Sequence, residues 1–206
     1  MKDKNFFQKK EKVLQRLRES ASLKLQVADK CADEIVAAAN LIADSIESGG
    51  KVLLCGNGGS AADCQHMATE FTSVLSKDFN RPGLPAISLT TDTSFITAFA
   101  NDFGFEDVFA REVQALGRAG DVLILISTSG NSRNILQATK EARTRGIHTI
   151  GLTGEGGRLA KMVDIAIIVP SKNTQYIQES HCAIEHIISE ITEEIFLKTL
   201  KKQKTL

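Results

Sequence analysis

Five short apolar segments, each bounded by glycine or polar turn residues, constrain the fold of this chain more than any other feature. Segments with the 3.6-residue spacing of helices lie between them, so strand and helix alternate along the chain. Strands that are apolar throughout and separated by helices predict a parallel sheet covered on both faces. We therefore expect an α/β fold, a doubly wound three-layer α/β/α sandwich. The expected strands are Lys51–Cys55, Pro85–Leu89, Val122–Ile126, His148–Leu152 and Ile165–Val169, and the expected helices between and after them are Ala61–Leu75, Ser132–Arg145 and about Thr174–Leu200.

The region before the first strand has an amphipathic helical pattern. Apolar residues recur at helical spacing from Ile35 to Ile46, and the pattern stops at Gly49 and Gly50. We expect the stretch from Phe6 to about Ile46 to pack on the domain or on a second subunit. With 206 residues and no Pro-rich or Ser-rich linker, the chain predicts one domain over 1–206, with a helical region at about 5–48 and an α/β core at about 51–200.

The composition excludes several classes of function. Lys and Arg together number 25 and are balanced by 25 Asp and Glu, so no general field attracts nucleic acid or a membrane surface. No apolar stretch is long enough to span a bilayer, and the N-terminus leads into no signal-peptide core, which predicts a cytoplasmic protein. The four cysteines form no CxxC pair, so neither a disulfide framework nor a thiolate zinc site is expected.

A glycine-rich turn follows the first predicted strand, with Asn57, Gly58, Gly59 and Ser60 leading into a helix. Exposed backbone N–H groups and a helix N-terminus can approach a polar or anionic ligand there. The spacing differs from the G-x-G-x-x-G fingerprint, and the lysine of a P-loop is missing, so no nucleotide cofactor is predicted. Taken by itself, the motif is better explained as a tight strand-to-helix turn without a ligand.

A cluster of hydroxyl groups follows the third predicted strand: Ser127, Thr128, Ser129 and Ser132. One hydroxyl is explained by helix capping. The whole cluster, beside free backbone N–H groups, is typical of a phosphate monoester site. Ligands of open parallel sheets bind at the carboxyl ends of the strands, where this loop is expected. A sugar phosphate is the expected ligand.

Two more polar segments follow the second predicted strand. Asp92 is a candidate to orient the hydroxyl cluster, and Asn101 and Asp102 are candidates to bind sugar hydroxyls. Helix caps and turns are the alternative explanation for all three residues.

Two pairs of polar residues share helix faces. His66 and Glu70 are four residues apart, and Gln178 and His186 are eight apart, so each pair lies on roughly one side of its helix. Such residues suit acid–base chemistry or metal binding, although a surface contact is the more frequent explanation of a His–Glu pair at this spacing.

Taken together, these motifs resemble the bacterial phosphoheptose isomerases, within the sugar isomerase (SIS) domain group. The resemblance runs in order from about residue 30 to residue 197 and is carried by four motifs: Cys55–Ser60, Asn101–Phe105, Ser127–Ser132 and Ile177–His181. It implies a flavodoxin-like five-stranded parallel sheet and a homotetramer with active sites where subunits meet. It also implies conversion of sedoheptulose 7-phosphate to D-glycero-D-manno-heptopyranose 7-phosphate through an enediolate, at the start of ADP- or GDP-heptose biosynthesis.

The resemblance also implies roles for individual residues. Glu70 and His186 correspond to the catalytic acid–base pair, and the hydroxyl loop to the phosphate site. One zinc ion per subunit is implied, with His66, Glu70, Gln178 and His186 as its ligands. The implied sugar pocket consists of Asn57, Gly58, Gly59, Ser60, Asn101 and Asp102, with Asp92 and Gln178 as further candidates.

A non-catalytic SIS-domain protein is the alternative interpretation, either one that binds the replication initiator or one that senses sugar phosphates. The initiator-binding relatives lack the acidic residue and the histidine that this chain has at Glu70 and His186. A transcription regulator needs an additional DNA-binding domain, for which about 30 residues before the domain are too few. Both observations favour the enzyme.

Overall fold

The central feature of the structure, a computed structural model that describes residues 4–75 and 81–203, is a five-stranded sheet. Every neighbouring pair of strands is parallel, and the order is β2-β1-β3-β4-β5. This is the order of flavodoxin-like folds, so the predicted fold class is confirmed. The strands are β1 (Val52–Gly56), β2 (Ala86–Ser88), β3 (Val122–Ser127), β4 (His148–Gly154) and β5 (Ile165–Val169).

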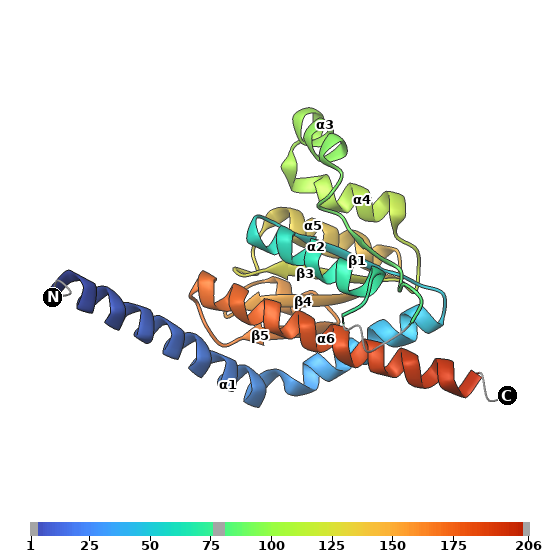
Figure 1. Ribbon diagram of the computed structural model, residues 1–206. Helices are drawn as coiled ribbons and strands as arrows, with labels where there is room; N and C mark the ends of the chain where they lie inside the picture. Colours follow the sequence, from blue (N-terminus) through green and yellow to red (C-terminus); the bar gives the residue numbers. More distant parts are fainter. Residues whose placement is uncertain (1–3, 76–80, 204–206) are drawn as a thin grey trace.

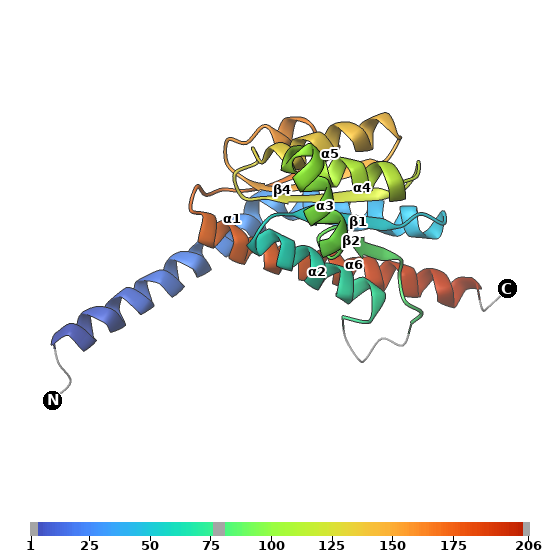
Figure 2. The same cartoon turned by 90° about the horizontal axis from the view of Figure 1, so that it is seen from above.

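Helices cover both faces of this sheet and make the three layers (Figures 1 and 2). One face packs against α1, α2 and α6 in a core that contains Ile42, Met67 and Ile188, and the other packs against α4 and α5 in a core that contains Phe109 and Ile135. The helices are α1 (Lys4–Glu47), α2 (Gly59–Thr72), α3 (Thr93–Phe103), α4 (Val108–Leu116), α5 (Arg133–Thr144) and α6 (Thr174–Gln203), with short 3₁₀ turns η1 (Phe105–Asp107) and η2 (Leu159–Lys161). In the part of the chain that the structure describes, none of the helices combines the length and the apolar character that crossing a membrane needs.

The first helix has two halves with different surroundings. Its C-terminal half carries the predicted apolar stripe and packs on the sheet and on α6, with Ile35 and Ile42 buried. Its N-terminal half projects away from the sheet (Figure 1) and exposes Leu17 to 65% and Leu25 to 70%. The predicted packing on the domain therefore begins at about Ser20 and Leu23, which are both buried. We call the projecting residues 4–19 the arm.

The segment between β2 and β3 differs from the expectation of loops. It forms α3 and α4, and Asn101 and Asp102, expected in a turn, lie in the last turn of α3. No residue of α3 is buried. Three rings line one side of α3, where Phe99 contacts Phe95 and Phe103. The helix packs on the core of the α4–α5 layer through the partly buried Phe95, Ile96 and Phe99.

A buried carboxyl group in α4 predicts how stability changes with pH. Glu112 is 7% exposed, and one of its oxygens has no hydrogen-bond partner among the described residues. Burial, with a further contribution from Asp92, raises the pKa of Glu112 to about 8. The folded state therefore holds a proton that the unfolded state releases near pH 4.5, so this group makes unfolding easier as the pH rises from about 4.5 to 8.

We expect Glu112→Gln to remove this part of the pH dependence. The variant should exceed the wild type in unfolding free energy by about 1–3 kcal/mol at pH 8 and should lose that advantage at pH 4.5. Urea denaturation at several pH values measures the difference. Glu190→Gln, which changes an exposed carboxylate, is the control and should keep the wild-type profile. A constant difference at all pH values would contradict the assignment.

Candidate functional site

Two loops meet at the carboxyl edge of the sheet. Strands β1 and β3 are neighbours, with Gly56 opposite Ile126, so the glycine-rich turn after β1 and the hydroxyl loop after β3 lie side by side. Gly58 has a φ of 56°, a left-handed conformation that favours glycine. Gly59 and Ser60 form the first turn of α2.

A pair of side-chain amides joins the two loops. The amide of Asn57 donates to Asn134 at 2.9 Å, and the amide of Asn134 donates back to Asn57 at 2.8 Å. Asn134 lies in the first turn of α5 and is buried. The amide of Asn57, predicted to line the sugar pocket, is therefore engaged within the protein. Sequence reasoning missed Asn134, since its partner is 77 residues away along the chain.

The hydroxyl loop is folded around a tight turn. The amide of Gly130, with φ of 60°, donates to the carbonyl of Ser127. The hydroxyls of Ser127 and Ser132 are 3.2 Å apart. Ser132 occupies the N-cap of α5 without using its side chain as a cap, and Ser129 is exposed. Hydroxyls and backbone N–H groups at a helix start provide the donors that an anion requires.

The three other predicted sugar-binding side chains lie on α3. The carboxylate of Asp92 accepts a hydrogen bond from the amide of Phe95 at 2.9 Å and so caps the helix. At the other end, the amide of Asn101 donates to Asp102 at 2.9 Å, and both residues are exposed. Within the described part of the chain, none of the side-chain hydrogen bonds of these residues reaches the hydroxyl loop.

A second group of functional side chains lies where α2 packs beside α6. Nε2 of His66 is 2.7 Å from Nε2 of His186, and it is 3.6 Å from a carboxylate oxygen of Glu70. The potential ligand atoms of these three residues all lie within 4.8 Å of one another. We call this group the His–Glu cluster. The imidazole of His66 is 44% exposed, so the cluster is open to solvent.

Gln178 lies apart from the His–Glu cluster. Its amide donates to Asp63 at 3.2 Å, and it contacts Gly59, where a side chain would collide with it. Eight residues of helix separate Gln178 from His186, which corresponds to about 12 Å along the axis. The structure thus joins three of the four predicted zinc ligands and places the fourth at the start of α2.

A hollow of about 560 Å³ lies next to Gln178 and is lined by Asp63, Gln175, Gln178, Glu179 and Cys182. Burial raises the pKa of Asp63. Behind it, Glu185 is buried, and burial with some repulsion from Asp63 raises the pKa of Glu185 to about 8. Sequence reasoning missed Asp63 and Glu185, because a single acidic residue at a helical position carries no signal of burial.

The His–Glu cluster fits a metal ion by its chemistry. Two imidazoles and one carboxylate are a ligand set found in catalytic zinc sites, which leave one position for water or substrate. The imidazoles of His66 and His186 and the carboxylate of Glu70 would hold such an ion between α2 and α6.

The Asn57–Asn134 pair predicts an energetic coupling between the two loops. Replacing Asn57 by alanine leaves the buried amide of Asn134 without this partner, which should lower the unfolding free energy by about 1–3 kcal/mol. Replacing Asn134 by alanine should cost less, because Asn57 is only half-buried. Urea denaturation of both single variants and the double variant forms a double-mutant cycle. The loss of unfolding free energy in the double variant should be clearly smaller than the sum of the losses in the two single variants. Additive losses would show that the two amides act independently.

Comparisons with known proteins identify the family of this chain. A profile of the SIS domain family matches residues 16–154. A phosphoheptose isomerase of Chlorobaculum tepidum is 51% identical over 187 residues, covering 90% of this chain and 90% of that protein. The fold superposes on the phosphoheptose isomerases of Neisseria gonorrhoeae and Francisella tularensis with TM-scores of 0.84 and 0.85, at 43% and 40% identity; the matches cover 90% and 89% of this chain and 98% and 97% of theirs. The chain therefore belongs to the SIS-domain family and, within it, to the phosphoheptose isomerases.

Proposed function

We propose that this protein is an aldose–ketose isomerase that converts sedoheptulose 7-phosphate to D-glycero-D-manno-heptopyranose 7-phosphate, the first step of ADP- or GDP-heptose biosynthesis. The observation that carries the proposal is the His–Glu cluster, in which Glu70 and His186 lie beside His66. The chain is about half identical to phosphoheptose isomerases over nine-tenths of its length, which supports the same chemistry. A single SIS domain over residues 1–206 and a cytoplasmic location are part of the proposal.

Isomerisation requires two coordinated proton transfers, and the cluster offers one group for each. The carboxylate of Glu70 acts as the base that takes a proton from C1 of the ketose and returns it to C2. The imidazole of His186 moves the proton of the O1 hydroxyl to O2 as the enediolate forms and collapses. No atoms are gained or lost, so no redox or nucleotide cofactor is needed. Groups positioned in this way contribute typically about 10²–10⁴-fold each to such a reaction.

The hydroxyl loop holds the phosphate in this proposal. Ser127, Thr128, Ser129 and Ser132 supply neutral donors, and the N-terminus of α5 adds the positive end of its dipole. Neutral donors suit a ligand that must leave after each turnover. The sugar pocket would be completed by the glycine-rich turn and by the polar side chains at the two ends of α3. These residues are Asn57, Gly58, Gly59, Ser60, Asp92, Asn101 and Asp102.

Zinc is the proposed metal of the cluster, one ion per subunit. His66, Glu70 and His186 would hold it, with Gln178 as the fourth ligand. When bound, zinc supplies a Lewis acid that polarises the ketose carbonyl. The distance of about 12 Å between Gln178 and His186 along α6 supports a fourth ligand from a second copy of the chain.

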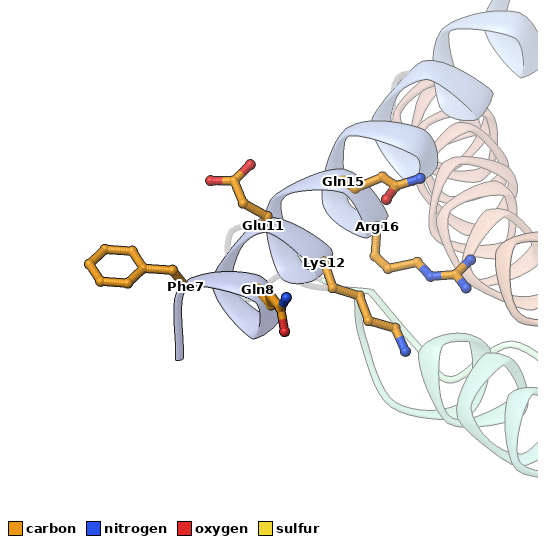
Figure 3. Close-up of a pocket in the computed structure, with 6 residues that line it drawn as sticks. All are labelled: Phe7, Gln8, Glu11, Lys12, Gln15 and Arg16. Carbon is orange, nitrogen blue, oxygen red and sulfur yellow. The ribbon is translucent and has the colours of Figure 1, made fainter. Parts of the chain in front are cut away.

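A homotetramer with sites shared between subunits is the proposed assembly, because the binding loops and the base lie far apart within one chain. Glu70 lies eleven residues after Gly59, about 16 Å along α2, too far for one sugar phosphate to span comfortably from the loops to the base within one chain. The arm also exposes apolar side chains, among them Phe7, Val13 and Leu17. Figure 3 shows Phe7 pointing away from the rest of the protein while Arg16 extends towards α6, where it accompanies Tyr176.

A hollow of about 620 Å³ on this arm is lined by α1 alone, through Phe7, Gln8, Glu11, Lys12, Gln15 and Arg16. It lies on the projecting half of the helix, away from the His–Glu cluster, so it suits a subunit contact better than a substrate site.

A non-catalytic sugar-phosphate sensor is the second candidate function. The fold resembles the Vibrio vulnificus NanR protein complexed with ManNAc-6P, with a TM-score of 0.57 at 13% identity, a likeness that shows the fold alone. The presence of both Glu70 and His186 beside each other favours the enzyme, because a sensor needs no acid–base pair.

Turnover tests the proposed chemistry. Purified protein should convert sedoheptulose 7-phosphate, and Glu70→Gln should lower kcat by at least about 10³-fold, because the amide keeps the shape and cannot accept the proton. The matched control is Glu190→Gln, an exposed carboxylate on α6. Removing zinc with a chelator should reduce turnover, and adding zinc back should restore it. Folded wild-type protein without turnover under any metal condition would favour the sensor.

Sedimentation equilibrium tests the shared sites. Wild-type protein at micromolar concentration should sediment as a tetramer, and Leu17→Asp in combination with Leu25→Asp should weaken assembly, since two charges enter an apolar surface. Activity should fall together with the tetramer. An active monomer would contradict sites built from more than one subunit.

A further inference from the structure

A buried arginine outside the His–Glu cluster joins the two helices that carry it. The guanidinium of Arg81 donates to the carboxylate of Glu193 at 2.5 Å. The same group donates to three backbone carbonyls, those of Glu70 at 2.8 Å, Phe71 at 2.9 Å and Pro82 at 3.0 Å. The side chains of Arg81 and Glu193 are each 1% exposed, so this ion pair is removed from water.

Two of the acceptors of Arg81 lie in the last turn of α2, the turn that carries the proposed base Glu70. Helix α2 ends at Thr72, and carbonyls in the last turn of a helix have no donor within the helix. Arg81 supplies that donor to Glu70 and Phe71, with a charge that also suits the negative end of the helix dipole. The backbone of the proposed catalytic base is thereby held directly by the guanidinium.

The other partner of Arg81 lies on the helix that carries His186. Glu193 follows His186 by seven residues, two turns of α6, so the two side chains lie on roughly the same side of that helix. One guanidinium therefore ties the last turn of α2, which carries Glu70, to α6. The separation between the carboxylate of Glu70 and the imidazole of His186 depends on how these helices slide and rotate against each other.

We propose that Arg81, through its ion pair with Glu193, is a positioning residue that fixes Glu70 against His66 and His186. The expected loss of kcat rests on the proposed isomerase function. The expected displacement of Glu70 rests on the packing of α2 beside α6 alone. Acid–base groups lose much of their catalytic effect when they are misplaced by about 1 Å. A rigid contact between α2 and α6 therefore favours fast proton transfer.

The main test replaces both partners, Arg81→Met with Glu193→Leu, because removing one alone leaves a buried charge and can unfold the protein. We expect the double variant to fold and to keep its KM, with kcat lowered by about 10–100-fold. Arg81→Lys keeps the charge but cannot reach all four acceptors, and it should lie between the wild type and the double variant in kcat.

The control is a second ion pair, which involves neither α2 nor α6. Lys51 contacts Asp121 at 2.6 Å beside the starts of β1 and β3, and the two side chains are 20% and 4% exposed. Lys51→Met should lower thermal stability and leave kcat unchanged. A merely structural role of Arg81 would give the same result for both pairs, with stability lost and kcat retained.

Crystal structures of the wild type and the double variant separate the two hypotheses. Displacement of Glu70 from His66 and His186 in the variant supports positioning, even if the wild type shows no turnover and the proposed function fails. Wild-type kcat together with an unmoved Glu70 in the double variant would overturn the proposal. Should the double variant not fold, the same two readouts on Arg81→Lys decide.

Discussion

The packing of α2 beside α6 on one face of the parallel sheet is the contact on which the candidate site depends. Both helices begin at the carboxyl edge of the sheet and run in the same direction. Three links follow one another along them: Asp63 with Gln178, His66 with His186, and Glu70 with Glu193 through Arg81. Each link brings together residues more than a hundred positions apart in sequence, directly or through Arg81. The proposed chemistry belongs to the middle link, and the proposed role of the outer two polar contacts is to hold its geometry.

The loops at the carboxyl edge follow a different physical rule. A parallel sheet places the ends of β1 and β3 next to each other, so a glycine-rich turn and a hydroxyl loop become neighbours without any contact between α2 and α6. The Asn57–Asn134 pair then holds the two loops in register. The proposed function thus divides into two tasks: binding of the phosphate at helix N-termini, and proton transfer between α2 and α6. The separation of about 16 Å between them along α2 is the reason for proposing a site completed by a second subunit.

Helix α6 also contains buried ionisable side chains. Glu185 and the imidazole of His181 are both buried in α6, and burial raises the pKa of Glu185 to about 8 and lowers that of His181 to about 4. Both groups are therefore held neutral near pH 7. Burying a neutral group costs less free energy than burying a charged one. Helix α6 can therefore bury Glu185 and His181 next to the sheet while its more exposed side presents His186.

The sequence by itself determined the sheet, the helices that flank it and most of the residue types of the site. Apolar runs and helical spacing are local signals, so five parallel strands and the helices at residues 59–72, 133–144 and 174–203 followed from them. The resemblance to the phosphoheptose isomerases then implied roles for Glu70, His66, His186 and the hydroxyl loop. The tertiary structure alone decided which of these residues meet. It placed Gln178 with Asp63 instead of with His186, engaged Asn57 with Asn134, and buried Arg81 and Glu193 in one ion pair, because contacts between distant segments depend on how helices pack and leave no periodic pattern in the chain.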